Sequence, residues 1–141
     1  MNFVEMFRTT PSERALLVEK GMPAKAVRVM AKRMAVPEES LINMLGLSRA
    51  AVDRKVRQDK PLSSQESSRV LAMGSLIGQV QVMVEESGNP EGFNAAEWTA
   101  TWLDRPVPAL GGRRPGELMD TVDGQALVSS LVARMQSGAY A

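Results

Sequence analysis

The sequence contains neither cysteine nor histidine, and these two absences exclude several classes of site. Without cysteine there is no disulfide, no thiol nucleophile and no zinc–thiolate centre. Without histidine the chain lacks the most common general base and the most common metal ligand. No carboxylate pair or lysine cluster offers a substitute, so we expect a protein that is not an enzyme and needs no cofactor or metal.

Long apolar runs and a strong charge of either sign are also missing. No apolar segment approaches the roughly 20 residues that cross a bilayer, and Glu5 interrupts the first apolar residues in a way that signal peptides do not show. We therefore expect a cytoplasmic protein with no membrane partner. The net charge of +1 gives no overall attraction to nucleic acid, so any DNA-binding surface must be local.

Helical spacing of apolar residues runs along most of the 141 residues, whereas strand-like alternation is nearly absent. The pattern predicts an all-α fold, with an N-terminal helix-turn-helix bundle and a long helix followed by a small α-helical C-terminal domain. A change in composition at 87–93 divides the chain into domains 1–87 and 88–141. We expect helices over 12–20, 23–35, 37–45, 48–58, 63–87, 94–104, 115–120 and 123–137.

Capping residues mark several of these helix ends. Ser12 is expected to cap the helix that stops at Gly21, and Asn94 caps a later one. The segment "SSQE", 63–66, has the capping-box pattern and opens the longest helix. The apolar stripe of that helix is wide enough to contact two neighbours or a second subunit, and it consists of Val70, Met73, Leu76, Ile77, Val80, Met83 and Val84.

The segment "LINMLGLSRAAVDRKV", 41–56, has the most specific pattern in the chain. Apolar residues four apart face inward from two short helices, Gly46 supplies the tight turn between them, and Ser48 caps the second helix. This arrangement predicts a helix-turn-helix. Its inward residues are Leu41, Leu45, Leu47, Val52 and Val56.

The second helix of this unit carries a basic outer face. Between 48 and 60 there are five basic and two acidic residues in an otherwise nearly neutral chain. Small and basic side chains suit a DNA major groove and its phosphates, and a single unit of this kind implies a dimer that contacts two half-sites. An αα-hairpin with a solvated basic face is the alternative, because Asp53 would repel phosphates. The predicted DNA-binding residues are Ser48, Arg49, Ala50, Arg54, Lys55 and Arg57.

A second unusual stretch, "RPVPALGGRRPGELMD", spans 105–120. It is not a phosphate loop, because no strand precedes Gly111 and no lysine follows the glycines. We interpret it as a structural bend in which Gly111 and Gly112 adopt positive φ and Pro115 starts a short helix. Ala109 and Leu110 are expected to tuck under the tryptophans.

Two further groups of large apolar side chains are also assigned. Trp98 and Trp102 lie one helical turn apart and are expected to be core residues rather than contact residues. The apolar residues near the N-terminus, Phe3, Val4, Met6 and Phe7, are expected to pack across a subunit boundary.

The C-terminal third also carries a resemblance. Its order of "W-L", "P-ALGGR-P-EL-DT-G" and a closing "GAYA" resembles the C-terminal toxin-binding domain of the Xre/MbcA/ParS antitoxin family, whose usual upstream element is a helix-turn-helix. The resemblance covers about residues 22–141. The matching residues are Trp102, Leu103, Pro108, Ala109, Leu110, Gly111, Gly112, Arg113, Pro115, Glu117, Leu118, Asp120, Thr121, Gly124, Gly138 and Tyr140; Arg114 stands where the family often has a smaller polar residue.

The resemblance implies an antitoxin of a type II toxin–antitoxin pair. Such antitoxins dimerise, bind their own operator DNA and block a RES-domain toxin that consumes NAD, with the C-terminal domain covering the toxin's active-site entrance. The tyrosine near the end, the only one in the chain, suits an interface anchor. The toxin-contact residues implied for this chain are Arg113, Arg114, Ser137, Gly138, Tyr140 and Ala141.

One alternative function remains open from the sequence. The chain could be a stand-alone helix-turn-helix regulator whose C-terminal domain senses a partner or ligand. A neighbouring reading frame for a RES-type toxin would favour the antitoxin.

Overall fold

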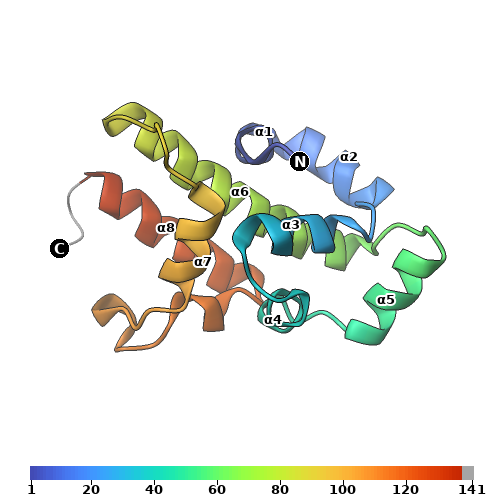
Figure 1. Cartoon of the computed structure of the whole chain (residues 1–141). Coiled ribbons are helices and arrows are strands. Elements are labelled where there is room, and N and C mark those ends of the chain that lie inside the picture. The colour runs from blue at the N-terminus through green and yellow to red at the C-terminus, as the bar shows by residue number, and fades with distance from the viewer. Residues whose placement is uncertain (138–141) are drawn as a thin grey trace.

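The computed structural model describes residues 1–137, which form eight α-helices and two short 3-10 helices (Figure 1). This confirms the predicted all-α class. Within the same range no helix is long and apolar enough to cross a membrane. The helices are α1 (Phe3–Arg8), α2 (Pro11–Lys20), α3 (Ala26–Met34), α4 (Glu38–Met44), α5 (Arg49–Arg57), α6 (Ser64–Ser87), α7 (Ala95–Leu103), η1 (Pro108–Leu110), η2 (Pro115–Leu118) and α8 (Val122–Ser137).

Helix α6 runs through the middle of the molecule, with α1 and α2 on one side and α7 and α8 on the other (Figure 1). Its predicted apolar stripe is buried in the core of the same chain: Val70, Met73, Leu76, Ile77 and Val80 are all at most 3% exposed. The last turns are less enclosed, since Met83 and Val84 are half-buried. A helix with apolar residues around most of its circumference needs this central place.

Two glycines on α6 allow α1 to approach its backbone. A Cβ atom at Gly78 would lie 2.0 Å from the carbonyl oxygen of Phe3, and one at Gly74 would lie 2.2 Å from the sulfur of Met6. Phe3 is buried there, and the Arg33 guanidinium lies 4.7 Å from the centre of its ring. The expectation that Phe3 packs across a subunit boundary is wrong, because α6 of the same chain buries it. Met6 is half-buried against the same core, and for Met6, Val4 and Phe7 the expectation stays a prediction.

The start of α2 differs from the sequence-based expectation. Its cap is Thr10, not Ser12: the Thr10 hydroxyl accepts from the Glu13 N–H, and the Glu13 carboxylate accepts from the Thr10 N–H. The reason is the Thr-x-x-Glu capping box with Pro11 at the first helical position, which is a stronger start signal than a serine two residues after Thr10.

Helix α3 begins at Ala26, later than expected. Pro23 forms an isolated antiparallel bridge with Pro61, and the Leu62 N–H donates to the Met22 carbonyl over 2.7 Å. This pairing holds the segment after α2 extended, so the helix cannot start at Pro23.

The capping box of Ser63 and Glu66 and the cap at Asn94 are confirmed. Helix α6 ends at Ser87, where the proposed division into 1–87 and 88–141 falls. Contacts cross this point: the Gln79 side chain donates to the Ser129 carbonyl over 3.0 Å and accepts from the Ser129 hydroxyl over 2.9 Å. The division stays a prediction.

We expect Gly78→Ala to lower the free energy of unfolding by about 1–3 kcal/mol, because the added methyl group must displace backbone. Alanine is intrinsically the better helix former by about 1 kcal/mol, so the loss must come from the contact with α1. Gly74→Ala is the matched control, since its methyl group meets no backbone but only the flexible side chains of Met6 and Met30. Urea unfolding of both variants measures the difference, and equal losses would contradict the role of Gly78.

Candidate functional site

The turn between α4 and α5 has the geometry predicted for a helix-turn-helix. Leu41, Leu45 and Val52 are fully buried, and Gly46 adopts a φ of 66°, where an L side chain is strained. Arg69 of α6 holds the turn from the other side, because its guanidinium donates to the Gly46 carbonyl over 2.9 Å. The turn is therefore fixed by packing and by one hydrogen-bonded arginine that the sequence analysis did not identify.

The turn also touches the C-terminal part of the chain. A Cβ atom at Gly46 would lie 3.1 Å from the Cβ atom of Asp120, which follows η2. No side chain larger than hydrogen therefore fits at position 46 unless Asp120 shifts.

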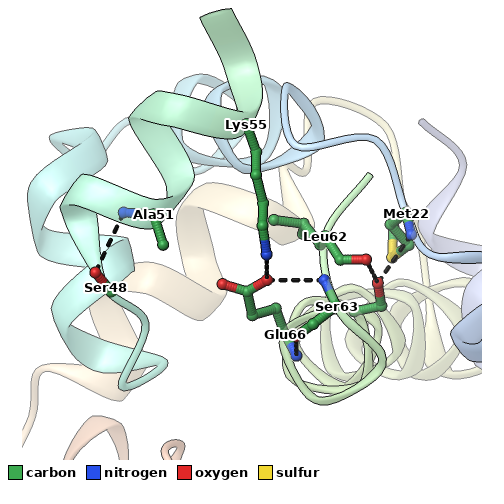
Figure 2. Close-up of polar contacts among 8 residues, drawn as sticks. Met22, Ser48, Ala51, Lys55, Leu62, Ser63 and Glu66 are labelled. Atoms are coloured by element: carbon green, nitrogen blue, oxygen red, sulfur yellow. Dashed lines mark hydrogen bonds and ion pairs between the residues drawn. The ribbon is translucent and has the colours of Figure 1, made fainter. Parts of the chain in front are cut away.

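Helix α5 starts as predicted. The Ser48 hydroxyl accepts from the Ala51 N–H over 3.2 Å and caps the helix (Figure 2). Five of the six predicted DNA-binding residues, Ser48, Arg49, Ala50, Arg54 and Arg57, are exposed. The geometry therefore leaves a polar and basic face of α5 open to solvent.

Lys55 is the exception. Its ammonium group forms an ion pair with Glu66 at the start of α6, and the two side chains are only 17% and 15% exposed (Figure 2). The same carboxylate accepts from the Ser63 N–H in the capping box. Lys55 thus ties α5 to α6 instead of pointing to solvent; the capping box was visible in the sequence, but this third partner of Glu66 was not.

The surroundings of Glu66 shift its acidity. Burial alone raises the pKa of this carboxyl, but the hydrogen bonds from Lys55 and Ser63 and the charge of Lys55 outweigh burial and lower the pKa below its usual value. The charged form is therefore favoured in the folded state.

The acidic residue on the face of α5 is not isolated. Asp53 lies 3.8 Å from Arg49 and 3.9 Å from Arg28 of α3, and Arg49 also contacts Glu39 of α4 at 2.9 Å. These pairs are largely exposed, so each contributes little to stability, but they offset the negative charge that would repel phosphates. Arg54 and Arg57 have no ion-pair partner within residues 1–137, which leaves their charges available.

The glycine bend has the predicted backbone. Gly111 and Gly112 adopt φ values of 66° and 86°, and the Val107 N–H donates to the Arg113 carbonyl over 3.0 Å across the bend. The expected apolar plug is partly wrong: Ala109 is exposed, Leu110 is half-buried, and Val107 is the buried residue. The reason is that η1 tightens the chain after Val107 and turns Ala109 outward.

The predicted toxin-contact residues of the bend remain on the surface. The Arg113 side chain is 59% exposed and its nitrogen lies 3.9 Å from the Glu117 carboxylate. Arg114 is directed back to the end of α7, where it donates to the Asp104 carbonyl over 3.1 Å. Ser137 is the last residue of α8, and Gly138, Tyr140 and Ala141 lie outside the described residues.

The tryptophans lie where expected. Their rings stack with centroids 6.0 Å apart and planes 9° from parallel; Trp102 is buried and Trp98 is half-buried against the core. Within residues 1–137 no three acidic side chains gather in a way that could hold a metal ion.

We expect Glu66→Gln to lower the free energy of unfolding by about 1–2 kcal/mol at neutral pH, because glutamine keeps the cap but leaves the half-buried Lys55 ammonium without a charged partner. The folded-state pKa of Glu66 is lowered, so its contribution is present above the ordinary value of 4.5 and is lost as the pH falls below it. The gap between wild type and variant, measured by urea unfolding, should therefore narrow below that pH.

Glu13→Gln is the matched control, since Glu13 occupies the same position in an exposed capping box and has no lysine partner within residues 1–137 of its own chain. If Glu66→Gln lowers the free energy of unfolding no more than the control does, the ion pair with Lys55 adds no stability.

Comparisons with known proteins match both the helix-turn-helix region and the C-terminal region to antitoxin families. Residues 13–73 match the family described as the antitoxin Xre-like helix-turn-helix domain, and residues 91–138 match the antitoxin Xre/MbcA/ParS C-terminal toxin-binding domain. The "Prs ADP-ribosylating antitoxin" of Sphingobium sp. (strain YBL2) is 41% identical over 136 residues, which cover 96% of this chain and 86% of that protein. "Antitoxin Xre" of Yersinia enterocolitica serotype O:8 / biotype 1B (strain NCTC 13174 / 8081) is 22% identical over 152 residues, which cover 95% of this chain and 97% of that protein.

Proposed function

This chain belongs to the Xre/MbcA/ParS antitoxin family, and we propose that it neutralises a cognate RES-domain toxin by covering the entrance of the toxin's active site. The observation that carries the proposal is the order of the two matched regions, a helix-turn-helix followed by a toxin-binding domain, in a chain related over almost its whole length to an antitoxin. It acts by occlusion, not by catalysis.

The name of the Sphingobium relative supports a toxin that uses NAD. That name refers to ADP-ribosylation, and NAD is the ordinary donor of ADP-ribose. We propose that the partner of this chain consumes NAD, either by hydrolysis or by transfer to an acceptor. The toxin contacts proposed are the bend and the end of the chain: Arg113, Arg114, Ser137, Gly138, Tyr140 and Ala141.

We propose further that the chain represses its own operon as a cytoplasmic homodimer that binds operator DNA. Ser48 and the exposed arginines of α5 support this, since a capped helix N-terminus and flexible cations suit phosphates and guanine edges. The proposed contacts are Ser48, Arg49, Ala50, Arg54 and Arg57; Lys55 is omitted because Glu66 engages its charge.

Operator binding is tested with Arg49→Ala combined with Arg54→Ala. We expect weaker binding and a smaller dependence of affinity on salt, because fewer counterions are released when fewer phosphates are contacted. Fluorescence anisotropy at several salt concentrations measures both. Arg105→Ala, an exposed arginine after α7, is the control, and an unchanged affinity of the double variant would contradict the assignment of α5.

Toxin neutralisation is tested by deleting 138–141. We expect the shortened chain to fold and to bind operator DNA as before, but to inhibit the toxin's NAD consumption at least about tenfold more weakly, because an aromatic interface anchor is lost. The α5 double variant should inhibit fully, so each variant is the other's control. Full inhibition by the shortened chain would contradict the contact at 138–141 and leave the bend as the proposed contact.

The alternative of a stand-alone regulator is distinguished by its partner. An antitoxin should co-purify with the product of a neighbouring reading frame and abolish that protein's NAD consumption. A regulator would bind its operator but form no such complex.

A further inference from the structure

Helix α2 is the one helix of ten residues or more, within residues 1–137, that has no buried residue. Leu16 and Leu17 in its middle are 67% and 43% exposed. An amphipathic helix on a folded protein usually turns its large apolar side chains toward a neighbour. Here they face away from the chain's own core, so α2 presents an apolar face without a partner.

The exposed face of α2 has a defined composition. Glu13, Leu16, Leu17 and Lys20 are spaced i, i+3, i+4 and i+7, which places them on one side of the helix, and all four are exposed. The opposite side contacts α6, where the Arg14 guanidinium donates to the Ser75 hydroxyl over 3.1 Å. Lys20 has no ion-pair partner within residues 1–137. We call this side of the helix the α2 face.

The order of residues on the α2 face is self-complementary. In an antiparallel helix pair around a twofold axis, residue i of one copy opposes residue j of the other, and j opposes i. With the axis between Leu16 and Leu17, each leucine meets the other leucine of the second copy. In the same register Glu13 of each copy meets Lys20 of the other, at both ends of the pair.

We propose that the α2 face binds the α2 face of a second copy of this chain, in an antiparallel pair with the leucines at the centre and a glutamate–lysine pair at each end. Charge complementarity favours a second copy as the binding partner, because the α2 face carries both the acid, Glu13, and the base, Lys20, that pair in this register. A toxin or another protein could bind in the same way only if its own sequence carried a complementary arrangement of apolar, acidic and basic residues.

The α2 face is mechanically connected to the DNA-binding helix. Directly after Lys20, a Cβ atom at Gly21 would lie 2.5 Å from the Leu62 carbonyl. Met22 donates from its N–H to Ser67 over 2.8 Å, and its carbonyl accepts from Leu62 over 2.7 Å. The segment 58–62 leads from α5 into this contact, and α2 and α5 lie toward the same end of the molecule (Figure 1). Pairing through α2 therefore fixes two α5 helices relative to one another, which deepens the proposed operator function and rests on it.

The first experiment measures self-association by sedimentation velocity across a range of protein concentrations. The full-length chain should form a dimer, and Leu16→Ser combined with Leu17→Ser should raise the dimer dissociation constant about tenfold or more, because apolar area is lost on both copies. Leu127→Ser is the matched control, since Leu127 of α8 is 41% exposed and lies outside the α2 face. A dimer that responds to neither change, or equally to both, would overturn the proposal.

The second experiment tests the register through charge. Lys20→Glu should weaken the dimer, because each new glutamate then opposes Glu13 of the other copy. Adding Glu13→Gln removes that repulsion while glutamine keeps the capping box of α2, so the double variant should recover part of the association. No recovery would contradict the antiparallel register.

The third experiment uses the absence of cysteine. A single cysteine at position 17 or 16 can form a disulfide only with another molecule, so oxidation of a mixture of Leu16→Cys and Leu17→Cys should give a covalent heterodimer. Leu127→Cys is the control and should form no covalent dimer at the same concentration. Equal cross-linking of the control would overturn the proposal.

Failure of this inference is distinct from failure of the proposed function. If the α2 variants leave the dimer intact, operator binding and toxin inhibition are untouched and another surface pairs. If they dissociate the dimer, operator affinity should fall while inhibition of the toxin's NAD consumption is retained.

Discussion

The structure depends on the burial of one 24-residue helix, α6, around nearly its whole circumference. An apolar helix of this kind is stable only when neighbours cover it on every side. The chain supplies them from both ends: α1 and α2 from the N-terminus, α7 and α8 from the C-terminus. Because α6 packs against helices from both ends of the chain, it holds the N-terminal and C-terminal helices in a fixed position relative to one another.

The polar side chains of α6 then position the surfaces that the helix does not itself form. Glu66 at its start holds α5 through Lys55, Arg69 one turn later holds the turn before α5, and Gln79 holds α8 through Ser129. Each of these groups is partly shielded from water, where a hydrogen bond to a charged or polar group is stronger than on the open surface. A nearly neutral chain can thus present a basic helix in a fixed orientation without a large excess of positive charge.

The sequence predicted what local signals determine and missed what distant contacts determine. The caps at Ser48, Ser63 and Asn94, the turn at Gly46 and the all-α class follow from short patterns, and the structure agrees with them. The ion pair of Lys55 joins residues from two different helices, and the role of Gly78 depends on a segment 75 positions earlier, so no periodicity indicates either. Ala109 was expected to be covered but is exposed, and the buried residue is Val107, because proline spacing does not show which way a 3-10 turn faces.

The approach of Gly46 to Asp120 has an evolutionary consequence. A side chain at position 46 would press on position 120, and one at 120 that is bulkier near its Cβ would press on the turn. Position 46 lies in the region matched to a helix-turn-helix domain, and position 120 lies in the region matched to a toxin-binding domain. Their contact means that neither part can drift freely at this point: descendants of this sequence that change the turn should carry compensating changes beside it.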